Sequence, residues 1–274
     1  MNMQQPDLER RFGGLNRLYG ATAPDVLARA HVAVAGIGGV GSWSAEALAR
    51  CGIGALTLID MDHVAESNIN RQIHALGATL GQAKIEAMAA RIRDINPACR
   101  LTLVDDFVSP DNIESLFTAC LPDFLIDATD QAAAKIAMIL WARRQRCGLL
   151  VCGGAGGKTD PLALRGGDLS SSVNDALLSK LRQRLRKEHG YPGGGMAAGR
   201  AGKRVPKMGV SALWFDQQAL LPDAWAQQQS SPAQGPQGLS CAGYGSVVMV
   251  TAAMGMAAAD RAVKAVLAAA PSNR

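Results

Sequence analysis

The chain has 274 residues, of which 48% are hydrophobic and 19% are charged, so it has ample apolar material for a core and is not a disordered protein. Basic residues exceed acidic ones by 28 to 23, and the excess is local, because residues 180–207 carry nine basic residues and one acidic residue. Six cysteines without a Cys-x-x-Cys pair, and a polar opening MNMQQPDLERR without a signal peptide, predict a cytoplasmic protein with free thiols.

Strand and helix signals alternate over residues 31–153, which is typical of a parallel sheet covered by helices on both faces. Short apolar runs predict strands at HVAVAG, ALTLID, RLTLVDD, DFLIDATD and GLLVCGG. Helices are expected at SWSAEALARCG, LGQAKIEAMAARIRDI, residues 110–120 and residues 131–146. The predicted fold is therefore α/β, a Rossmann-like doubly wound and mainly parallel sheet with a C-terminal extension.

A glycine-rich loop joins the first predicted strand to the first helix. Gly36, Gly38 and Gly41 form a G-x-G-x-x-G pattern, and Gly39 lies within it. Bare backbone lets a phosphate approach the helix N-terminus, and Asp60 at the end of the second strand is placed to accept ribose hydroxyls. The pattern predicts a nucleotide site rather than a merely tight turn, but it leaves NAD and ATP as alternatives.

Polar side chains follow the second and fourth predicted strands. Because the carboxyl ends of parallel strands share one edge of a sheet, we expect these side chains to converge. Two of these side chains, Arg71 and Lys84, are cations, and together with the carboxylates they suit a nucleoside triphosphate with bound Mg²⁺. The alternative is that both are ordinary surface charges in contact with solvent. The predicted nucleotide contacts beyond the glycine loop are Asp60, Asp62, Asn68, Arg71, Gln72, Lys84 and Asp127, with Asp130 beside them.

After residue 157 the alternation of strands and helices ends. Residues 179–188 predict a basic helix, while YPGGGMAAGRAGKR and QQQSSPAQGPQG predict loops. With nine basic residues and one acidic residue, residues 180–207 carry a net charge of +8, which favours contact with RNA phosphates over a merely solvated helix face. The predicted RNA contacts are Arg182, Arg186, Lys203, Arg204 and Lys207.

An apolar stretch near the C-terminus is the strongest candidate for membrane contact. VVMVTAAMGMAAA, residues 247–259, is 13 residues long, and a spanning helix needs about 18 to 20. Its many Ala and Gly residues favour a buried or dimer-facing helix. Peripheral membrane contact stays open at this stage.

The motifs together resemble a known family. AGIGGVGSWSAEALARCGIG, LTLIDMDHVAESNINRQ, GQAKIEAM, INP and IDATD are similar to the adenylating enzymes related to ubiquitin-activating enzyme, the ThiF/MoeB/HesA group. RFGGLNRLYG, RQIHALGATLGQAK, VDDFVSPDN, GGAGGKTDP and CAGYG resemble one branch of that group, the tRNA threonylcarbamoyladenosine dehydratases. The likeness is dense over residues 10–160 and patchy over residues 161–274.

The resemblance implies ATP-dependent dehydration and cyclisation of threonylcarbamoyladenosine in the tRNA anticodon loop, after adenylation of its threonyl carboxylate. It implies ATP and Mg²⁺ as cofactors, a metal on Asp130, and catalysis by Arg71, Lys84 and Asp130. It also implies a homodimer in which an arginine of the N-terminal arm reaches the partner's site; Arg11 and Arg17 are both candidates, and we favour Arg17. A monovalent-ion site and a cysteine desulfurase partner, as in some relatives, stay open.

The expected organisation is one compact unit with an N-terminal arm (1–30), an ATP-binding core (31–160) and a C-terminal substrate and dimerisation region (161–274). Three alternative functions remain: an adenylyltransferase for the C-terminus of a small ubiquitin-like sulfur carrier, an NAD-dependent oxidoreductase, and a non-catalytic RNA-binding module. Protein-activating relatives commonly bind zinc through two Cys-x-x-Cys pairs, so their absence predicts no zinc. Cys152 and Cys241 lie near Gly-rich turns, where buried inert thiols are expected rather than nucleophiles.

Overall fold

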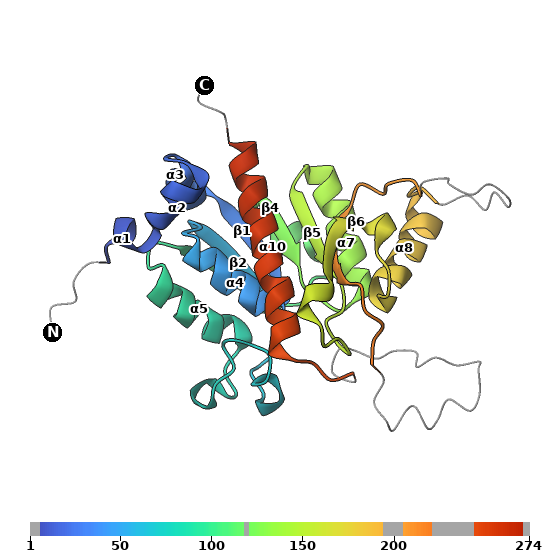
Figure 1. Ribbon diagram of the computed structural model, residues 1–274, viewed down its shortest axis with the longest axis horizontal. Coiled ribbons are helices and arrows are strands. Elements are labelled where there is room, and N and C mark those ends of the chain that lie inside the picture. The colour runs from blue at the N-terminus through green and yellow to red at the C-terminus, as the bar shows by residue number, and fades with distance from the viewer. Residues whose placement is uncertain (1–5, 118–120, 194–204, 221–243, 271–274) are drawn as a thin grey trace.

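The computed structural model describes residues 6–117, 121–193, 205–220 and 244–270 (Figure 1). Within these residues, one sheet has the strand order β3-β2-β1-β4-β5-β7-β6. Neighbouring strands are parallel, except that β6 is antiparallel to β7. The predicted α/β fold with a mainly parallel sheet is confirmed. The strands are β1 (His31–Ala35), β2 (Ala55–Ile59), β3 (Arg100–Val104), β4 (Phe124–Asp127), β5 (Gly148–Cys152), β6 (Leu164–Asp168) and β7 (Ser211–Phe215).

The register of the central strands fixes where the polar segments leave the sheet. Ala35, the last residue of β1, lies opposite Ile59 of β2 on one side and Asp127 of β4 on the other. Asp127 in turn lies opposite Val151 of β5. The strands therefore end at one level, and the segments that follow β1, β2 and β4 all begin at the same carboxyl edge.

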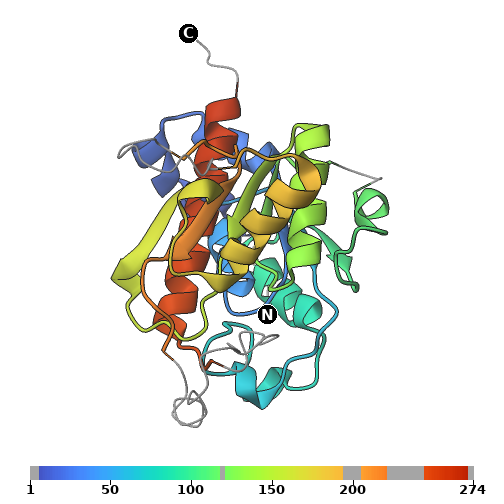
Figure 2. The same ribbon diagram turned by 90° about the vertical axis from the view of Figure 1, so that its right-hand side faces the viewer.

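Alternating side chains of the strands divide the core into two layers. Val32 and Val34 of β1 pack with α4, α5 and α10 on one face, and Ala33 and Ala35 pack with α7 on the other. Farther along the sheet, α8 covers β5 and β7 on the α7 side (Figures 1 and 2). The covering helices are α4 (Gly41–Arg50), α5 (Lys84–Ile95), α6 (Ile113–Leu116), α7 (Ala132–Gln145), α8 (Ala176–His189) and α10 (Val248–Ala269).

The chain beyond residue 160 completes this architecture. β7 pairs with β5, and α10 lies against α4 and the sheet. α10 has 22 residues, longer than the expected stretch 247–259, and it continues through Asp260 and Arg261 because Ala262 and Val263 extend its buried face. Among the described residues, no helix combines the length and hydropathy needed to cross a membrane.

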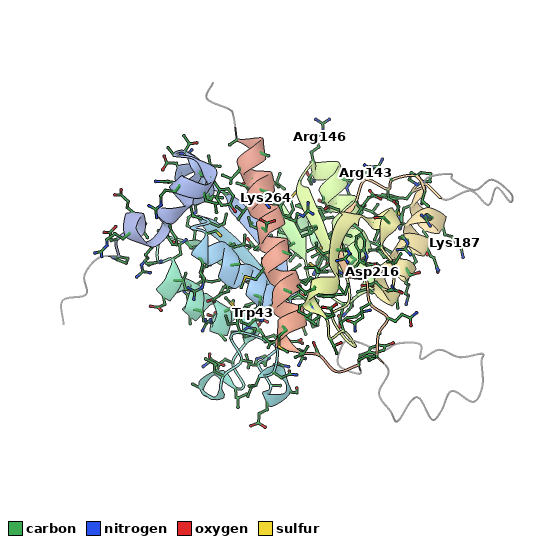
Figure 3. The ribbon with its side chains drawn as sticks, in the orientation of Figure 1. Trp43, Arg143, Arg146, Lys187, Asp216 and Lys264 are labelled. Carbon is green, nitrogen blue, oxygen red and sulfur yellow. The ribbon has the colours of Figure 1, made fainter. Side chains whose placement is uncertain are left out.

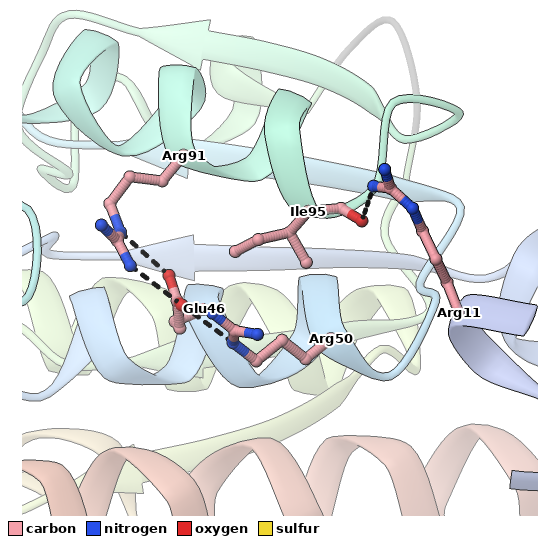
Figure 4. A network of polar contacts seen from close by, with 5 residues as sticks. All are labelled: Arg11, Glu46, Arg50, Arg91 and Ile95. Carbon is pink, nitrogen blue, oxygen red and sulfur yellow. Dashed lines mark hydrogen bonds and ion pairs between the residues drawn. The ribbon is translucent and has the colours of Figure 1, made fainter. Parts of the chain in front are cut away.

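The N-terminal arm forms three short helices at the amino edge of the sheet, opposite the polar segments (Figure 1). The Arg11 guanidinium donates to the backbone oxygens of Asp94 at 2.6 Å and Ile95 at 2.7 Å, so it caps the C-terminal end of α5 (Figure 4). The division into arm, core and C-terminal region stays a prediction. The arm helices are α1 (Leu8–Phe12), α2 (Gly14–Tyr19) and α3 (Ala23–Arg29).

The boundaries of α5 and α6 also differ from the sequence prediction. The helix expected from Leu80 begins at Lys84, because the 3-10 helix η2 (Gly77–Thr79) and a turn at Gly81, with φ of +79°, precede it. In the stretch 110–120, only α6 is helical among the residues described. The later start of α5 places Lys84 in the first turn of the helix, where its side chain points back toward the carboxyl edge.

Candidate active site

A cavity of about 410 Å³ lies at the carboxyl edge of the sheet. Its walls come from the glycine loop after β1, the segments after β2, β3 and β4, the first residue of α5 and the start of α10. The structure thus brings together residues that the sequence spreads over more than two hundred positions. The predicted site residues that line the cavity are Gly36, Gly38, Gly39, Asp60, Asp62, Asn68, Arg71, Gln72, Lys84 and Asp130.

The glycines of the loop have different physical roles. Gly36 has φ of +85°, and a Cβ there would lie 2.9 Å from the backbone oxygen of Ala128. A Cβ on Gly41 would lie 1.8 Å from the backbone oxygen of Gly36, whereas one on Gly38 would meet nothing within 4 Å. Gly41 therefore allows the helix to pack on the loop and does not line the cavity, which differs from its expected contact with the nucleotide. Gly38 leaves an open backbone surface for a ligand.

Asp60 ties the segments after β1 and β2 together. One carboxylate oxygen accepts the Ile37 N–H at 2.6 Å and the other accepts the Asp62 N–H at 2.9 Å. Burial raises the pKa of Asp60, and the nearby Lys84 ammonium and the two backbone hydrogen bonds offset part of that rise. Each carboxylate oxygen keeps further acceptor capacity toward the cavity.

Lys84 holds a buried positive charge at the cavity wall. Its ammonium lies 2.7 Å from a carboxylate oxygen of Asp62; the Lys84 side chain is 8% exposed and that of Asp62 is 56% exposed. The Lys84 N–H also donates to the Asp62 backbone oxygen at 2.9 Å. Because the carboxylate is solvated and the ammonium is not, an anionic ligand in the cavity can replace Asp62 as the partner of Lys84.

The loop that carries Arg71 is anchored by two helices. The Arg71 backbone oxygen accepts the indole N–H of Trp43 at 3.0 Å and the hydroxyl of Thr251 at 3.2 Å. The Asn70 side-chain amide donates to the Ser246 backbone oxygen at 2.8 Å. α4 and the chain at the start of α10 therefore hold this loop from both sides. Arg71 lines the cavity, and its guanidinium donates to the Ser67 backbone oxygen and to the Asn70 side-chain oxygen at 3.0 Å.

Two amides of the same loop are buried. The Asn68 side-chain oxygen accepts the Ala65 N–H at 3.0 Å and closes the 3-10 helix η1 (Glu66–Asn68). Gln72 is 5% exposed and lines the cavity, and its side-chain oxygen has no hydrogen-bond partner within the described part of the chain. A buried acceptor without a partner is unfavourable, so Gln72 is suited to receive a donor from a bound ligand.

The two aspartates at the carboxyl end of β4 have different environments. Asp127 is fully buried and pairs with the Lys135 ammonium at 3.0 Å, and it also accepts the hydroxyl of Thr129 at 2.7 Å. Lys135 donates in addition to the Cys152 backbone oxygen at 2.8 Å, so the pair links the ends of β4 and β5. Asp127 is not among the residues that line the cavity, because its carboxylate is buried beside Lys135, and its expected contact with the nucleotide stays a prediction. Asp130 is exposed and lines the cavity.

Several cavity residues were missed by sequence reasoning. Ser246 and Thr251 come from the start of α10, about 180 residues after Arg71 in the chain, as their hydrogen bonds to that loop show. Phe107 and Val108 follow β3 and lie within VDDFVSPDN. The resemblance of this stretch to the family was the one feature of the sequence that could have indicated their place in the site. The contribution of α10 had no such signal, because an apolar helix pattern does not reveal which loop the helix contacts.

The predicted RNA contacts do not form one group. Arg182 donates to the Ser172 backbone oxygen at 2.6 Å and to its hydroxyl, and Arg186 donates to the Pro192 backbone oxygen at 3.1 Å. These hydrogen bonds tie Arg182 to the segment before α8, and its expected contact with RNA stays a prediction. Lys207 is exposed. The remaining predicted contacts, Lys203 and Arg204, lie outside the described residues.

The arm arginine and the thiols lie away from the cavity. Arg17 is exposed on α2 at the amino edge, so it does not reach the cavity of its own chain (Figure 1). Burial raises the pKa of the Cys152 thiol to about 12, and the nearby Lys135 only partly opposes this rise. Such a thiol is not a nucleophile at neutral pH. Cys241 lies outside the described residues.

Residues 14–274 match the profile of the ThiF family. The chain belongs to the ThiF family. It is 45% identical over 262 residues to the tRNA threonylcarbamoyladenosine dehydratase of Escherichia coli, with 94% of each chain covered. The crystal structure of that E. coli enzyme in complex with ATP has a TM-score of 0.80 and 43% identity, with 95% of each chain covered.

A ThiF relative with a different activity is less similar. The molybdopterin-synthase adenylyltransferase of Salmonella typhimurium is 35% identical over 111 residues, which is 40% of this chain and 44% of the relative. The resemblance inferred from the sequence motifs is confirmed by these comparisons. The match to the E. coli dehydratase covers 94% of the chain, whereas the match to the adenylyltransferase covers 40% of it.

Proposed function

We propose that this ThiF-family protein is an ATP-dependent tRNA threonylcarbamoyladenosine dehydratase. One observation carries the proposal: the cavity at the carboxyl edge joins an open glycine backbone at Gly38 to two cations, Arg71 and Lys84, and to an exposed carboxylate, Asp130. The relatives that match nearly the whole chain are dehydratases of this kind, and one of them has been crystallised with ATP.

Each part of ATP has a complementary surface in the cavity. Phe107 and Val108 offer apolar surface for the adenine ring, and Asp60 offers acceptors for the ribose hydroxyls. Gly38 gives the phosphates access to backbone N–H groups at the start of α4. Arg71 and Lys84 then neutralise the terminal phosphates. A nicotinamide cofactor has no use for this pair of cations, which favours ATP over NAD.

A divalent metal fits the same cavity. No cluster of three or more His, Cys, Asp or Glu side chains arranged for a metal occurs in the parts of the chain described here. Mg²⁺ needs no such cluster, because it is commonly held by one or two carboxylates together with substrate phosphates and water. Asp130 would hold it, and the bound ion would supply further neutralisation of the departing pyrophosphate.

The proposed reaction begins with the threonyl carboxylate of the modified adenosine. A carboxylate oxygen attacks the α-phosphorus of ATP, the bond to pyrophosphate breaks, and an acyl-adenylate forms. Arg71 and Lys84 stabilise the negative charge that develops on the pyrophosphate. The neighbouring carbamoyl group then attacks the acyl carbon and expels AMP, so the ring closes and the elements of water are lost. The protein contributes alignment and charge neutralisation.

The site is proposed to be completed by a second copy of the chain. Arg17 lies at the edge opposite its own cavity, so it can act only in a partner's site, whereas Arg11 is engaged in capping α5. This difference favours Arg17 as the arm arginine of a homodimer. A monovalent-ion site and a sulfur-transfer partner stay predictions.

The experiment is mass spectrometry of nucleosides from tRNA that carries threonylcarbamoyladenosine, after incubation with the protein, ATP and Mg²⁺. We expect the modified nucleoside to lose the mass of one water, with AMP and pyrophosphate formed in equal amounts. Lys84→Met should reduce product formation by about 10²- to 10³-fold. Lys264→Met, a change at an exposed lysine of α10, should leave it unchanged (Figure 3).

Three other results would contradict the proposal. ATP–pyrophosphate exchange stimulated by a small sulfur-carrier protein and not by tRNA would identify an adenylyltransferase. Reduction of NAD without ATP turnover would identify an oxidoreductase. RNA binding without any turnover, unaffected by Lys84→Met, would identify a binding module.

A further inference from the structure

Helix α8 connects the cavity to a distant part of the surface. Its N-cap Asp175 accepts the N–H groups of Leu178 and Gly154, both at 2.8 Å, which fixes the start of the helix to the segment after β5. Leu177 in its first turn lines the cavity. The 14 residues of α8 extend about 20 Å from there, along the outside of the molecule (Figure 2).

The basic residues of α8 form two rows with different environments. Leu178, Leu181 and Leu185 are buried against the sheet. The inner row, Arg182 and Arg186, donates to backbone oxygens close to the helix, as described above. The outer row consists of Lys180, Arg184 and Lys187, whose spacing of four and three residues places them on one face of the helix.

The outer row is strongly positive. α8 contains five basic residues and one acidic residue, a net charge of +4, which is the highest among the helices described. The acidic residue is Glu188, whose carboxylate lies 3.1 Å from the Arg184 guanidinium. A hydrogen bond from Arg184 lowers the pKa of Glu188, and the side chains of Arg184 and Glu188 are 37% and 41% exposed. Glu188 is also adjacent to Lys187, whose charge contributes to the lowered pKa, so one carboxylate offsets the three cations of the outer row only in part.

The positive surface continues onto the end of α7. The Arg143 guanidinium lies over the ring of Tyr191, 5.4 Å from its centroid, and Tyr191 follows the C-terminal end of α8. Arg143, Arg146 and Lys187 all project into solvent on this side of the molecule (Figure 3). Cations therefore extend from near the cavity, at Lys180, to the far end of the helix pair.

We propose that the outer row of α8, Lys180, Arg184 and Lys187, binds the phosphate backbone of the tRNA whose modified nucleoside occupies the cavity. This inference rests on the proposed function. RNA stems present phosphates at the edges of their grooves, and a row of cations along a helix complements such an edge without reading its sequence. The row lies on the opposite side of α8 from the inner arginines, so it places cations on a face of the helix where backbone oxygens of this chain do not hold them as they hold Arg182 and Arg186.

The test compares two triple variants of the full chain by direct tRNA binding. One is Lys180→Gln with Arg184→Gln and Lys187→Gln. The matched control removes the same charge at Arg29, Arg93 and Arg100, exposed residues of α3, α5 and β3. We expect the outer-row variant to bind unmodified tRNA at least about tenfold more weakly at 0.1 M salt, with the slope of log affinity against log salt reduced by about 2 to 3. The control should bind like the wild type.

ATP binding and thermal unfolding of both variants show whether they fold. If the triple variant does not fold, Lys180→Gln alone should still weaken binding and reduce the salt slope by about 1. Equal affinity and equal salt slope in the outer-row and control variants would overturn the inference. Binding is measured without turnover, so this outcome is distinct from a failure of the dehydration assay, which would overturn the proposed function instead.

Discussion

The two flanks of the cavity use charge in opposite ways. On the flank of β1, β2, α4 and α5, charged side chains are buried or tied to the backbone: Lys84 to Asp62, Asp60 to two N–H groups, and Glu46 to two arginines. On the flank of α8, the outer row is accessible to solvent: Lys180 and Lys187 are exposed, and the Arg184 side chain is 37% exposed. Buried charges are held in one geometry, which suits the stabilisation of charge that develops during a reaction. Exposed charges can adjust their positions, which suits binding to an extended polyanion such as RNA.

The difference predicts which measurement each substitution will change. Changes on the nucleotide flank should affect turnover or stability and leave tRNA affinity unchanged. Changes on the outer row of α8 should affect tRNA affinity and its salt dependence and leave the fold unchanged. If a substitution on the nucleotide flank changed tRNA affinity, or one on the outer row of α8 changed the fold, the two flanks would not be separate in function.

The largest effect is expected for Asp130→Asn. Loss of the carboxylate that would hold the metal should reduce the turnover number for dehydration by about 10³-fold. Binding of tRNA should be unchanged, because Asp130 lies within the cavity and not on α8. Asp25→Asn, at an exposed aspartate of α3, serves as the control and should be fully active. A decrease of less than tenfold for Asp130→Asn would exclude this carboxylate as the metal ligand.

A pH-dependent effect comes next, at His74. Burial lowers its pKa from 6.5 to about 4, with further lowering by Lys84 and Arg91. A depressed folded-state pKa means that the unfolded chain takes up the proton first, so stability is complete above pH 6.5 and falls as the pH decreases toward 4. The predicted loss over this window is on the order of 3 kcal/mol.

Urea unfolding of wild type and His74→Leu at several pH values measures this effect. Both ring nitrogens of His74 lack hydrogen-bond partners within the described residues, so an apolar replacement of similar size should fold. The variant should show a flatter decline in the free energy of unfolding between pH 6.5 and 4. His189→Gln, at an exposed position, should decline like the wild type. The same decline in His74→Leu would rule out His74 as the titrating group.

Glu46 tests the link between α4 and α5. Its side chain is 2% exposed and lies 2.6 Å from the Arg50 guanidinium and 3.1 Å from that of Arg91 (Figure 4). Glu46→Gln keeps the shape and removes the charge, so we expect the free energy of unfolding to fall by about 2 kcal/mol. Glu86→Gln, an exposed change on α5, should have little effect. Equal thermal stability of the two variants would show that this network does not hold the helices together.

The smallest effect separates two arginines of the same helix. Arg184→Gln should weaken tRNA binding by about threefold and leave stability unchanged, because its partner Glu188 is exposed. Arg182→Gln should lower the free energy of unfolding by about 1 kcal/mol, because it breaks the hydrogen bonds to Ser172. Thermal unfolding and tRNA titration of both variants measure this contrast. The reverse result would exchange the roles assigned to the inner and outer rows.

Much of the nucleotide flank was predictable because its signals are local. Gly36, Gly38 and Asp60 occupy positions relative to strands that sequence patterns predict, and parallel strands must end at a shared edge. Asp127 shows the limit of that reasoning. It lies at the correct edge, but the side chain at the last residue of β4 points into the core, where Lys135 neutralises it.

The sequence by itself determined the order of strands and helices over residues 31–153, the family, and the sheet edge at which a nucleotide site is expected, because these follow from periodicity and short motifs. It did not predict β6 and β7. Only the tertiary structure decided that Thr251 and Ser246 anchor the Arg71 loop, that Asp127 is buried, and that α8 presents Lys180, Arg184 and Lys187 to solvent. These outcomes depend on contacts between segments far apart in the chain, and a local pattern carries no information about which partner a side chain meets.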